Sequence, residues 1–155
     1  MLTPDMKRVV QQHPLGYVAT ASADGEPNLS PKGTFFVVDD TTIAFAEIRS
    51  PVTMRNLQAN PRIEVNFLDV FVRKGFRCTG NASIVKRGEC NFDRLLELSG
   101  SSLAPRIKAI VVIKVTRALP LVSPAYDDGT ATEDSLRRTY TTRFRKMQPG
   151  EKFEE

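Results

Sequence analysis

Apolar and polar side chains alternate with a period of two in several short stretches, which is the pattern of strands with one buried face. Ile63, Val65 and Phe67 are apolar, and Glu64 and Asn66 stand between them. Residues 107–115 form a nearly continuous β-branched stretch, which favours a central strand because such side chains pack well within a sheet. The other strands are expected over 15–22, 27–38, 42–46 and 76–86, which makes six in all.

Turns and short helices separate these strands. Residues 23–25 and 39–40 are turn sequences, so the first three strands are expected to form an antiparallel meander. The strand over 27–38 contains two prolines and is expected to be irregular or to lie near an edge, since proline cannot donate a ladder hydrogen bond. Helices are expected over 4–13, 51–58 and 89–98, and from residue 132 onward. The pattern predicts an all-β-dominated fold, a six-stranded antiparallel barrel with flanking helices.

The chain changes character near residue 121. Residues 1–120 hold the expected barrel, and 121–155 are expected to form a loop and a C-terminal helical arm of the same domain. One face of this helix is apolar, and we expect it to dock on the barrel or on a partner subunit. The apolar positions are Leu136, Tyr140, Phe144 and Met147. The opposite face is basic, which is typical of a solvated surface; a nucleic-acid patch is the alternative. Its cations are Arg137, Arg138, Arg143, Arg145 and Lys146.

Composition limits the classes of function. The chain has 155 residues, 41% hydrophobic and 26% charged, which fits one domain with a real core. A net charge of +4 suits an anionic ligand but is too small to indicate nucleic acid without a motif. No apolar stretch of about 18 residues exists, and the N-terminus lacks a secretory signal. The two cysteines are expected to be reduced thiols. We therefore expect a cytoplasmic protein that binds neither membranes nor nucleic acid.

Polar residues gather where the segment 28–60 passes from strand to loop to helix. The backbone N–H groups at a helix N-terminus carry partial positive charge, so hydroxyls and cations beside them suit a phosphate. A solvated strand edge and an ordinary helix cap are the alternative interpretation. The residues concerned are Ser30, Lys32, Gly33, Arg49, Ser50, Thr53 and Arg55.

The histidine and the two cysteines are weaker candidates for functional residues than the polar residues of segment 28–60. His13 is the only histidine, and we expect it on the surface rather than bound to haem iron. Cys78 lies in a strand and is expected to pack in the core, whereas Cys90 is expected in the first turn of a helix. No metal-ligand spacing and no catalytic triad is present, so we expect no metal site and assign no catalytic residue.

Two stretches resemble a known family. They are GYVATASADGEPNLSPKG at 16–33, which contains Lys32-Gly33, and NLQANPR at 56–62, in the order hairpin, strand, helix, strand. This order resembles the pyridoxamine 5'-phosphate oxidase-like proteins with the FMN-binding split barrel, over residues 1–120. The resemblance implies a homodimer with two FMN sites at the subunit interface. It also implies an oxidoreductase that acts on a small molecule, with NAD(P)H as a candidate electron donor.

The resemblance also implies which residues surround FMN. The strand segment with Lys32 would approach the flavin and its phosphate chain, and the loop 47–50 with the following helix start would surround the phosphate and ribityl chain. The implied set is Ser30, Lys32, Gly33, Thr34, Glu47, Ile48, Arg49, Ser50, Thr53 and Arg55.

The chain departs from the oxidases at three positions. The Arg-Lys pair at their helix start is replaced by Val52 and Thr53, and an Arg five residues before the strand lysine is replaced by Pro27. Their substitutes are expected to be Arg49, Ser50, Thr53 and Arg55, since Arg binds phosphate through two N–H groups. The departure argues against pyridoxamine 5'-phosphate oxidase activity itself. A non-catalytic flavin-binding or flavin-sensing protein and a deazaflavin F420-dependent reductase are the alternatives.

A second apolar segment is expected at the subunit interface. Residues 70–76, VFVRKGF, place Val70, Phe71, Val72 and Phe76 beside two cations. Leaving such apolar side chains in water is costly, so we expect a second subunit to cover them with the equivalent segment.

Overall fold

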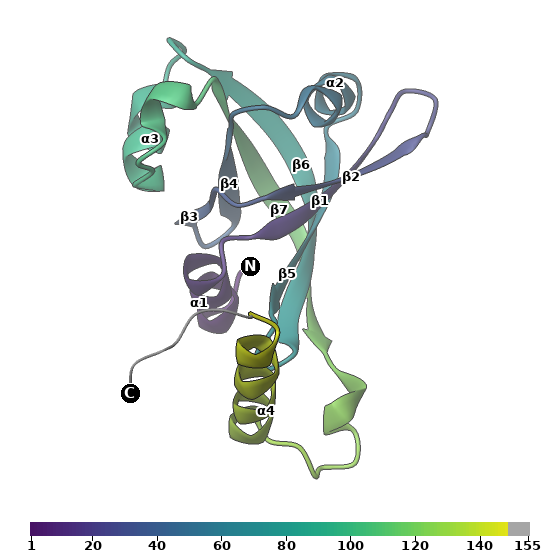
Figure 1. Ribbon diagram of the computed structural model, residues 1–155. Helices are drawn as coiled ribbons and strands as arrows, with labels where there is room; N and C mark the ends of the chain where they lie inside the picture. Colours follow the sequence, from purple (N-terminus) through teal and green to yellow (C-terminus); the bar gives the residue numbers. More distant parts are fainter. Residues whose placement is uncertain (149–155) are drawn as a thin grey trace.

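The computed structural model describes residues 1–148, and these residues form seven strands and four α-helices around one sheet (Figure 1). The strands are β1 Gly16–Ala21, β2 Pro27–Lys32, β3 Phe35–Asp39, β4 Thr42–Glu47, β5 Arg62–Asp69, β6 Lys74–Lys86 and β7 Ala109–Val122. The helices are α1 Pro4–Gln12, α2 Pro51–Ala59, α3 Phe92–Ser99 and α4 Glu133–Lys146. Two short 3-10 helices, Ala104–Arg106 and Pro124–Tyr126, flank β7.

All seven strands pair antiparallel in the order β2-β1-β5-β6-β7-β4-β3. The long strands β6 and β7 form the centre, and β2 and β3 are the two edges. The predicted antiparallel, β-dominated architecture is therefore confirmed. The ladder between the described strands does not close, so the sheet is open and a closed barrel is not confirmed.

The prediction of six strands was wrong at residues 27–38. This stretch forms two strands, β2 and β3, with a break at Gly33 and Thr34. β2 pairs with β1, whereas β3 pairs with β4 at the opposite edge of the sheet, so the predicted three-strand meander was also wrong. The expected edge position of the prolines is confirmed, because Pro27 and Pro31 lie on the edge strand β2.

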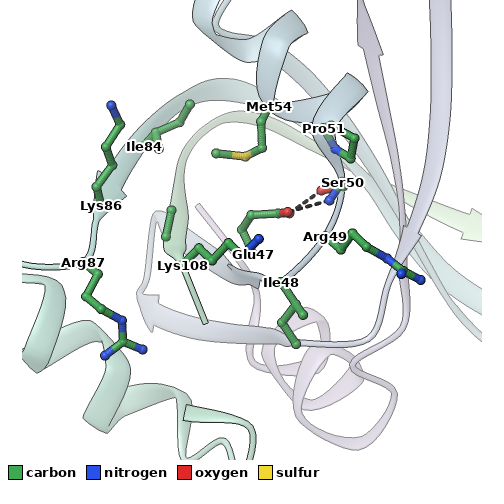
Figure 2. A pocket seen from close by; sticks show the side chains of 11 residues that line it. Glu47, Ile48, Arg49, Ser50, Pro51, Met54, Ile84, Lys86, Arg87 and Lys108 are labelled. Atoms are coloured by element: carbon green, nitrogen blue, oxygen red, sulfur yellow. Dashed lines mark hydrogen bonds between the residues drawn. The ribbon is translucent and has the colours of Figure 1, made fainter. Parts of the chain in front are cut away.

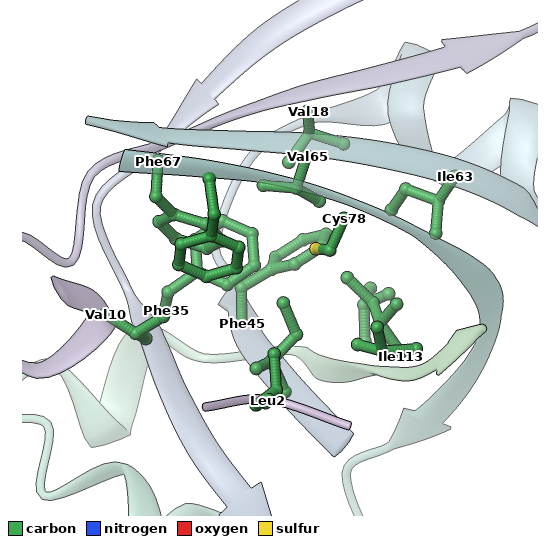
Figure 3. Close-up of a cluster of buried hydrophobic side chains, with 14 of the residues drawn as sticks. Leu2, Val10, Val18, Phe35, Phe45, Ile63, Val65, Phe67, Cys78 and Ile113 are labelled. Carbon is green, nitrogen blue, oxygen red and sulfur yellow. The ribbon is translucent and has the colours of Figure 1, made fainter. Parts of the chain in front are cut away.

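The sheet curls around an aromatic core that joins its two halves (Figure 3). The Phe35 ring of β3 lies 4.8 Å from the Phe67 ring of β5, and Phe67 stacks on Phe76 with ring centroids 5.0 Å apart. A Cβ atom at Gly16 would lie 2.6 Å from a ring carbon of Phe35, so glycine is needed where β1 approaches β3. The curl of the sheet thus depends on side-chain packing between strands such as β3 and β5, which do not pair with each other by backbone hydrogen bonds.

Helices cover the ends of the sheet. α1 is capped by Thr3, whose hydroxyl accepts the Met6 N–H at 3.2 Å, and Val9 and Val10 are buried against the core. α3 packs Phe92 on a second, smaller apolar cluster. α2 and α3 lie near one end of the long β6–β7 pair, and α4 lies near the other (Figure 1). The open rim beside α2 is where the site described below lies.

The C-terminal arm docks on the chain's own turn between β5 and β6, as the apolar face of its helix predicts. The Phe144 ring of α4 lies 5.6 Å from the Phe71 ring, edge to face, and the Arg73 guanidinium lies over Tyr140. Met147 remains 65% exposed. Phe71 was expected to face a second subunit, but it packs against the chain's own helix. Residues 149–155 of the expected arm lie outside the described part of the chain.

The two thiols differ in environment, which predicts different reactivity. Cys78 is buried in the core, and burial, with a further contribution from the negative charge of Glu64, raises its pKa to about 12. Cys90 is exposed and precedes α3, which begins at Phe92 rather than at the expected residue 89. Because the thiolate is the reacting species, we expect one thiol to react with dithionitrobenzoate at pH 8 in the native protein and two in guanidinium. The Cys90→Ser variant should show no native reaction, and rapid native labelling in that variant would contradict the burial of Cys78.

Candidate functional site

A pocket lies between the end of β2 and the loop after β4. Thr34 joins its two sides, because its hydroxyl donates to the Ala46 carbonyl at 2.7 Å and its own carbonyl accepts the Ala46 N–H at 3.4 Å. This pairing places residues 30–34 beside residues 46–50. The resulting pocket has a volume of about 240 Å³. It is lined by Ser30, Pro31, Lys32, Gly33, Thr34, Ala46, Glu47, Ile48, Arg49 and Ser50. We call it the Lys32 pocket.

Eight of the ten residues predicted for cofactor binding line the Lys32 pocket, and two do not. Both lie on α2, where Thr53 is on the buried face and Arg55 is exposed. The structure therefore brings together the strand residues and the loop residues that the sequence suggested. It does not bring Thr53 or Arg55 to the same pocket.

Lys32 is the charged centre of this pocket. Its residue is only 8% exposed, and its ammonium donates to the Ser30 hydroxyl. Burial lowers the pKa of Lys32, and the negative charge of Glu47 partly opposes that shift. Within residues 1–148, Ser30 is the one hydrogen-bond acceptor of this ammonium, which has three N–H donors. A buried cation with unused donors suits an anionic ligand.

Glu47 caps the start of α2 from inside the protein. Its buried carboxylate accepts the Ser50 backbone N–H at 2.5 Å and also accepts the Ser50 hydroxyl. A negative charge there is favourable because the helix N-terminus is partly positive. The donors of Ser50 are thus already used within the chain. Lys32 and Arg49 are the two cations that line this pocket.

A buried polar network holds α2 against the β1–β2 hairpin. The Asn56 amide donates to the Thr20 hydroxyl at 3.1 Å, and the Asn28 amide donates to Thr20 at 3.2 Å and to Thr53 at 3.3 Å. Thr53 therefore faces this network, which explains why it does not line the Lys32 pocket. Buried polar groups of this kind specify one arrangement of two elements.

Replacing Asn56 with Ala is expected to lower the free energy of unfolding by about 1–3 kcal/mol, because the buried Thr20 hydroxyl loses the Asn56 amide as a hydrogen-bond donor. Thermal unfolding followed by circular dichroism measures the change. Gln58→Ala is the matched control, since Gln58 is exposed on the same helix. A loss no larger than that of the control would contradict the role of the network.

A larger cavity of about 540 Å³ lies on the other side of the segment 47–50 (Figure 2). We call it the second cavity. β4, β7 and β6 build its floor, since Glu47 pairs with Ala109 and Ala109 pairs with Lys86 in the ladder. Sequence reasoning named Arg49 but missed Lys86, Arg87 and Lys108, because only this register brings them together. The lining is Glu47, Ile48, Arg49, Ser50, Pro51, Met54, Ile84, Lys86, Arg87, Lys108 and Ala109.

The remaining candidates lie elsewhere. His13 is not a free surface residue as expected, because its Nε2 lies 3.3 Å from the buried Asp69 carboxylate. The described residues contain no group of three or more His, Cys, Asp or Glu side chains that could hold a metal ion. Among residues 1–148, no helix is both long and apolar enough to cross a membrane.

Comparison with solved structures shows a shared class of fold. HupZ from Group A Streptococcus is 31% identical, with a TM-score of 0.67, over 79% of this chain and 96% of that chain. An FMN-binding protein from Syntrophomonas wolfei subsp. wolfei is 18% identical, with a TM-score of 0.66, over 79% and 87%. HutZ, the heme storage protein from Vibrio cholerae, is 20% identical, with a TM-score of 0.59, over 78% and 94%. The last two matches show the fold alone.

The family follows from the sequence comparison. The family model described as pyridoxamine 5'-phosphate oxidase matches residues 2–118, and the chain belongs to this family. The suspected resemblance is therefore confirmed. A comparison with curated proteins found no match.

Proposed function

We propose that the protein binds FMN in the Lys32 pocket and acts as a flavin-dependent oxidoreductase on a small molecule. The observation that carries this proposal is the buried Lys32 ammonium, which has unused donors in a pocket lined by residues that the family resemblance assigns to FMN. Membership of the family and the fold shared with an FMN-binding protein support it.

The lining residues fit FMN chemically. Lys32 and the exposed Arg49 supply positive charge for a phosphate, and Ser30 and Thr34 supply hydroxyls. Gly33 has open space where a side chain would stand, so a flat ring could approach the backbone there. When bound, FMN supplies the redox chemistry, and the protein binds it, orients it and excludes water. No residue of this chain needs to act as a general acid.

The size of the pocket supports a site shared between two subunits. Its volume of about 240 Å³ is below the range of about 300–1,000 Å³ that is usual for pockets of small ligands. One chain would therefore cover only part of an FMN molecule. We propose a homodimer in which the partner subunit completes each site.

The proposal does not extend to pyridoxamine 5'-phosphate as the substrate. Two positions where the oxidases carry basic residues are Pro27 and Val52, and both are exposed in this structure. Haem, the ligand named for HutZ, has less support, because the single histidine of the chain is paired with Asp69 away from the Lys32 pocket.

The visible absorption spectrum of the purified protein, followed by anaerobic titration with NADH and NADPH, tests the proposal. A flavin spectrum that bleaches with either donor and recovers with an acceptor is the expected result. A flavin spectrum that neither donor bleaches would indicate a non-catalytic flavin-binding protein. A deazaflavin or haem spectrum, or no affinity for added FMN, would contradict FMN as the cofactor.

A further inference from the structure

The second cavity combines apolar walls with free positive charge. Its apolar lining comes from α2, β6, β7 and the loop before α2, so the wall is part of the packed fold and not of a single loop. These residues are Ile48, Pro51, Met54, Ile84 and Ala109. Pockets for small organic molecules are usually apolar with a few polar groups that fix orientation. The second cavity has this composition and a volume within the usual range.

Three cations at this cavity have no partner in the described residues. The side chains of Arg49, Lys86 and Lys108 make no ion pair and donate no hydrogen bond within residues 1–148. Lys108 extends toward the middle of the cavity, while Arg49 and Lys86 lie on opposite sides of it (Figure 2). The positive charges are thus spread around the opening of the cavity and are not clustered at one place.

The other two charged groups of the lining are already used. Arg87 donates to the Ala104 and Ile107 carbonyls at 2.7 Å each, and its guanidinium lies over the Phe92 ring. The carboxylate of Glu47 is held by Ser50. An adjoining hollow shares Ile48, Arg49 and Lys108 and adds Arg106, another cation. The unused charge around the cavity is therefore positive.

We infer that the second cavity binds an organic anion that has an apolar body and a carboxylate or phosphate group. The apolar wall would hold the body, Lys108 would bind the charged end, and Lys86 would add positive potential at the rim of the cavity. The segment 47–50 separates this cavity from the Lys32 pocket and lines both. A role as the binding site for the substrate or electron donor rests on the proposed function, whereas anion binding itself does not.

Fluorescence titration with anilinonaphthalene sulfonate, an apolar anion, tests the inference on the full chain with and without FMN. Replacing both Lys86 and Lys108 with Met is expected to weaken binding of this probe about tenfold or more. Binding of neutral N-phenyl-1-naphthylamine and of FMN should not change. Lys146→Met is the matched control, because it removes one exposed cation from α4, remote from the cavity.

Competition identifies the charged group. Displacement of the probe by phenyl phosphate at lower concentration than by benzoate would assign a phosphate ligand, and the reverse would assign a carboxylate. Displacement by neither, or probe affinity that the double variant leaves unchanged, would overturn the inference. A double variant that loses FMN affinity instead would overturn it too, since the cavity would then belong to the flavin site. If the wild type bound no FMN but kept lysine-dependent probe binding, only the proposed function would fail.

Discussion

Replacing Lys32 with Met is expected to weaken FMN binding by roughly tenfold to a hundredfold. Lys32 is buried, and Ser30 accepts one of its three donors, so the ammonium has donors left for an anion. One charge-assisted hydrogen bond contributes about 1.5–3 kcal/mol, and each 1.4 kcal/mol is about a factor of ten in affinity. Met keeps most of the length and packing of the side chain and removes only the charge. Quenching of FMN fluorescence during titration measures the affinity.

Arg55→Ala is the control for this experiment. The sequence suggested Arg55 as a phosphate ligand, but the structure places it on the exposed side of α2 and outside the Lys32 pocket. Its replacement should therefore change FMN affinity less than twofold or threefold. If Arg55→Ala cost more affinity than Lys32→Met, the phosphate would lie elsewhere and the assignment of the pocket would be wrong.

Replacing Asp69 with Ala is expected to cost about 3 kcal/mol or more of the free energy of unfolding. The Asp69 carboxylate is buried and accepts the Phe71 N–H at 2.9 Å, and the Arg137 guanidinium and His13 Nε2 lie 3.1 and 3.3 Å from it. It joins α1, the turn after β5 and α4. Removing the buried carboxylate leaves the Phe71 and Val72 N–H groups without their acceptor, at about 1–3 kcal/mol each, and takes the ionic partner from the half-exposed Arg137 and from His13.

Chemical denaturation measures the stability of the Asp69 variant, and trypsin cleavage near Arg137 reports release of the arm. Asp40→Asn is the matched control, because Asp40 forms an exposed ion pair with Lys7 at 2.5 Å. Exposed pairs contribute about 0–1 kcal/mol, so this control should stay near the wild type. Equal stability of the two variants would show that the Asp69 cluster does not hold the arm.

The Asp69 cluster also predicts a dependence on pH. Burial alone would raise the pKa of Asp69, but the Phe71 N–H, the charge of His13 and the Arg137 hydrogen bond outweigh burial and lower it from the usual 3.8. A carboxyl with a lowered folded-state pKa stabilises the fold above its unfolded pKa, and this contribution is lost as the pH falls through the folded-state value. Below about pH 4, the wild type should therefore lose more stability per pH unit than Asp69→Asn does.

Local patterns were enough to predict most elements and most of the Lys32 pocket. Turn residues and alternating apolar positions indicated the strands, and Lys32-Gly33 and the loop 47–50 carried the resemblance to the family. These segments come together because Thr34 and Ala46 pair across the start of β3 and the end of β4. The sequence did not determine which way the side chains at the start of α2 point, so Thr53 and Arg55 were wrongly placed in the pocket.

The errors arose where contacts between distant residues decide the outcome. Residues 27–38 read as one strand, but their two halves pair with different neighbours at opposite edges of the sheet. Thr53 reads as a helix-start hydroxyl, but the Asn28 amide of the hairpin turns it toward a buried network. Lys86 and Lys108 lie 22 positions apart in the sequence, and they line the same cavity only because the register of β6 and β7 pairs Lys86 with Ala109. No local pattern contains that pairing.

The direct test of the central claim is a comparison of FMN and riboflavin affinity by isothermal titration at two salt concentrations. Riboflavin lacks the phosphate that Lys32 and Arg49 are proposed to bind. We predict that FMN binds at least about tenfold more tightly than riboflavin, that the advantage shrinks at high salt because Arg49 is exposed, and that Lys32→Met removes most of it. Equal affinity of the wild type for FMN and riboflavin would contradict phosphate recognition in the Lys32 pocket.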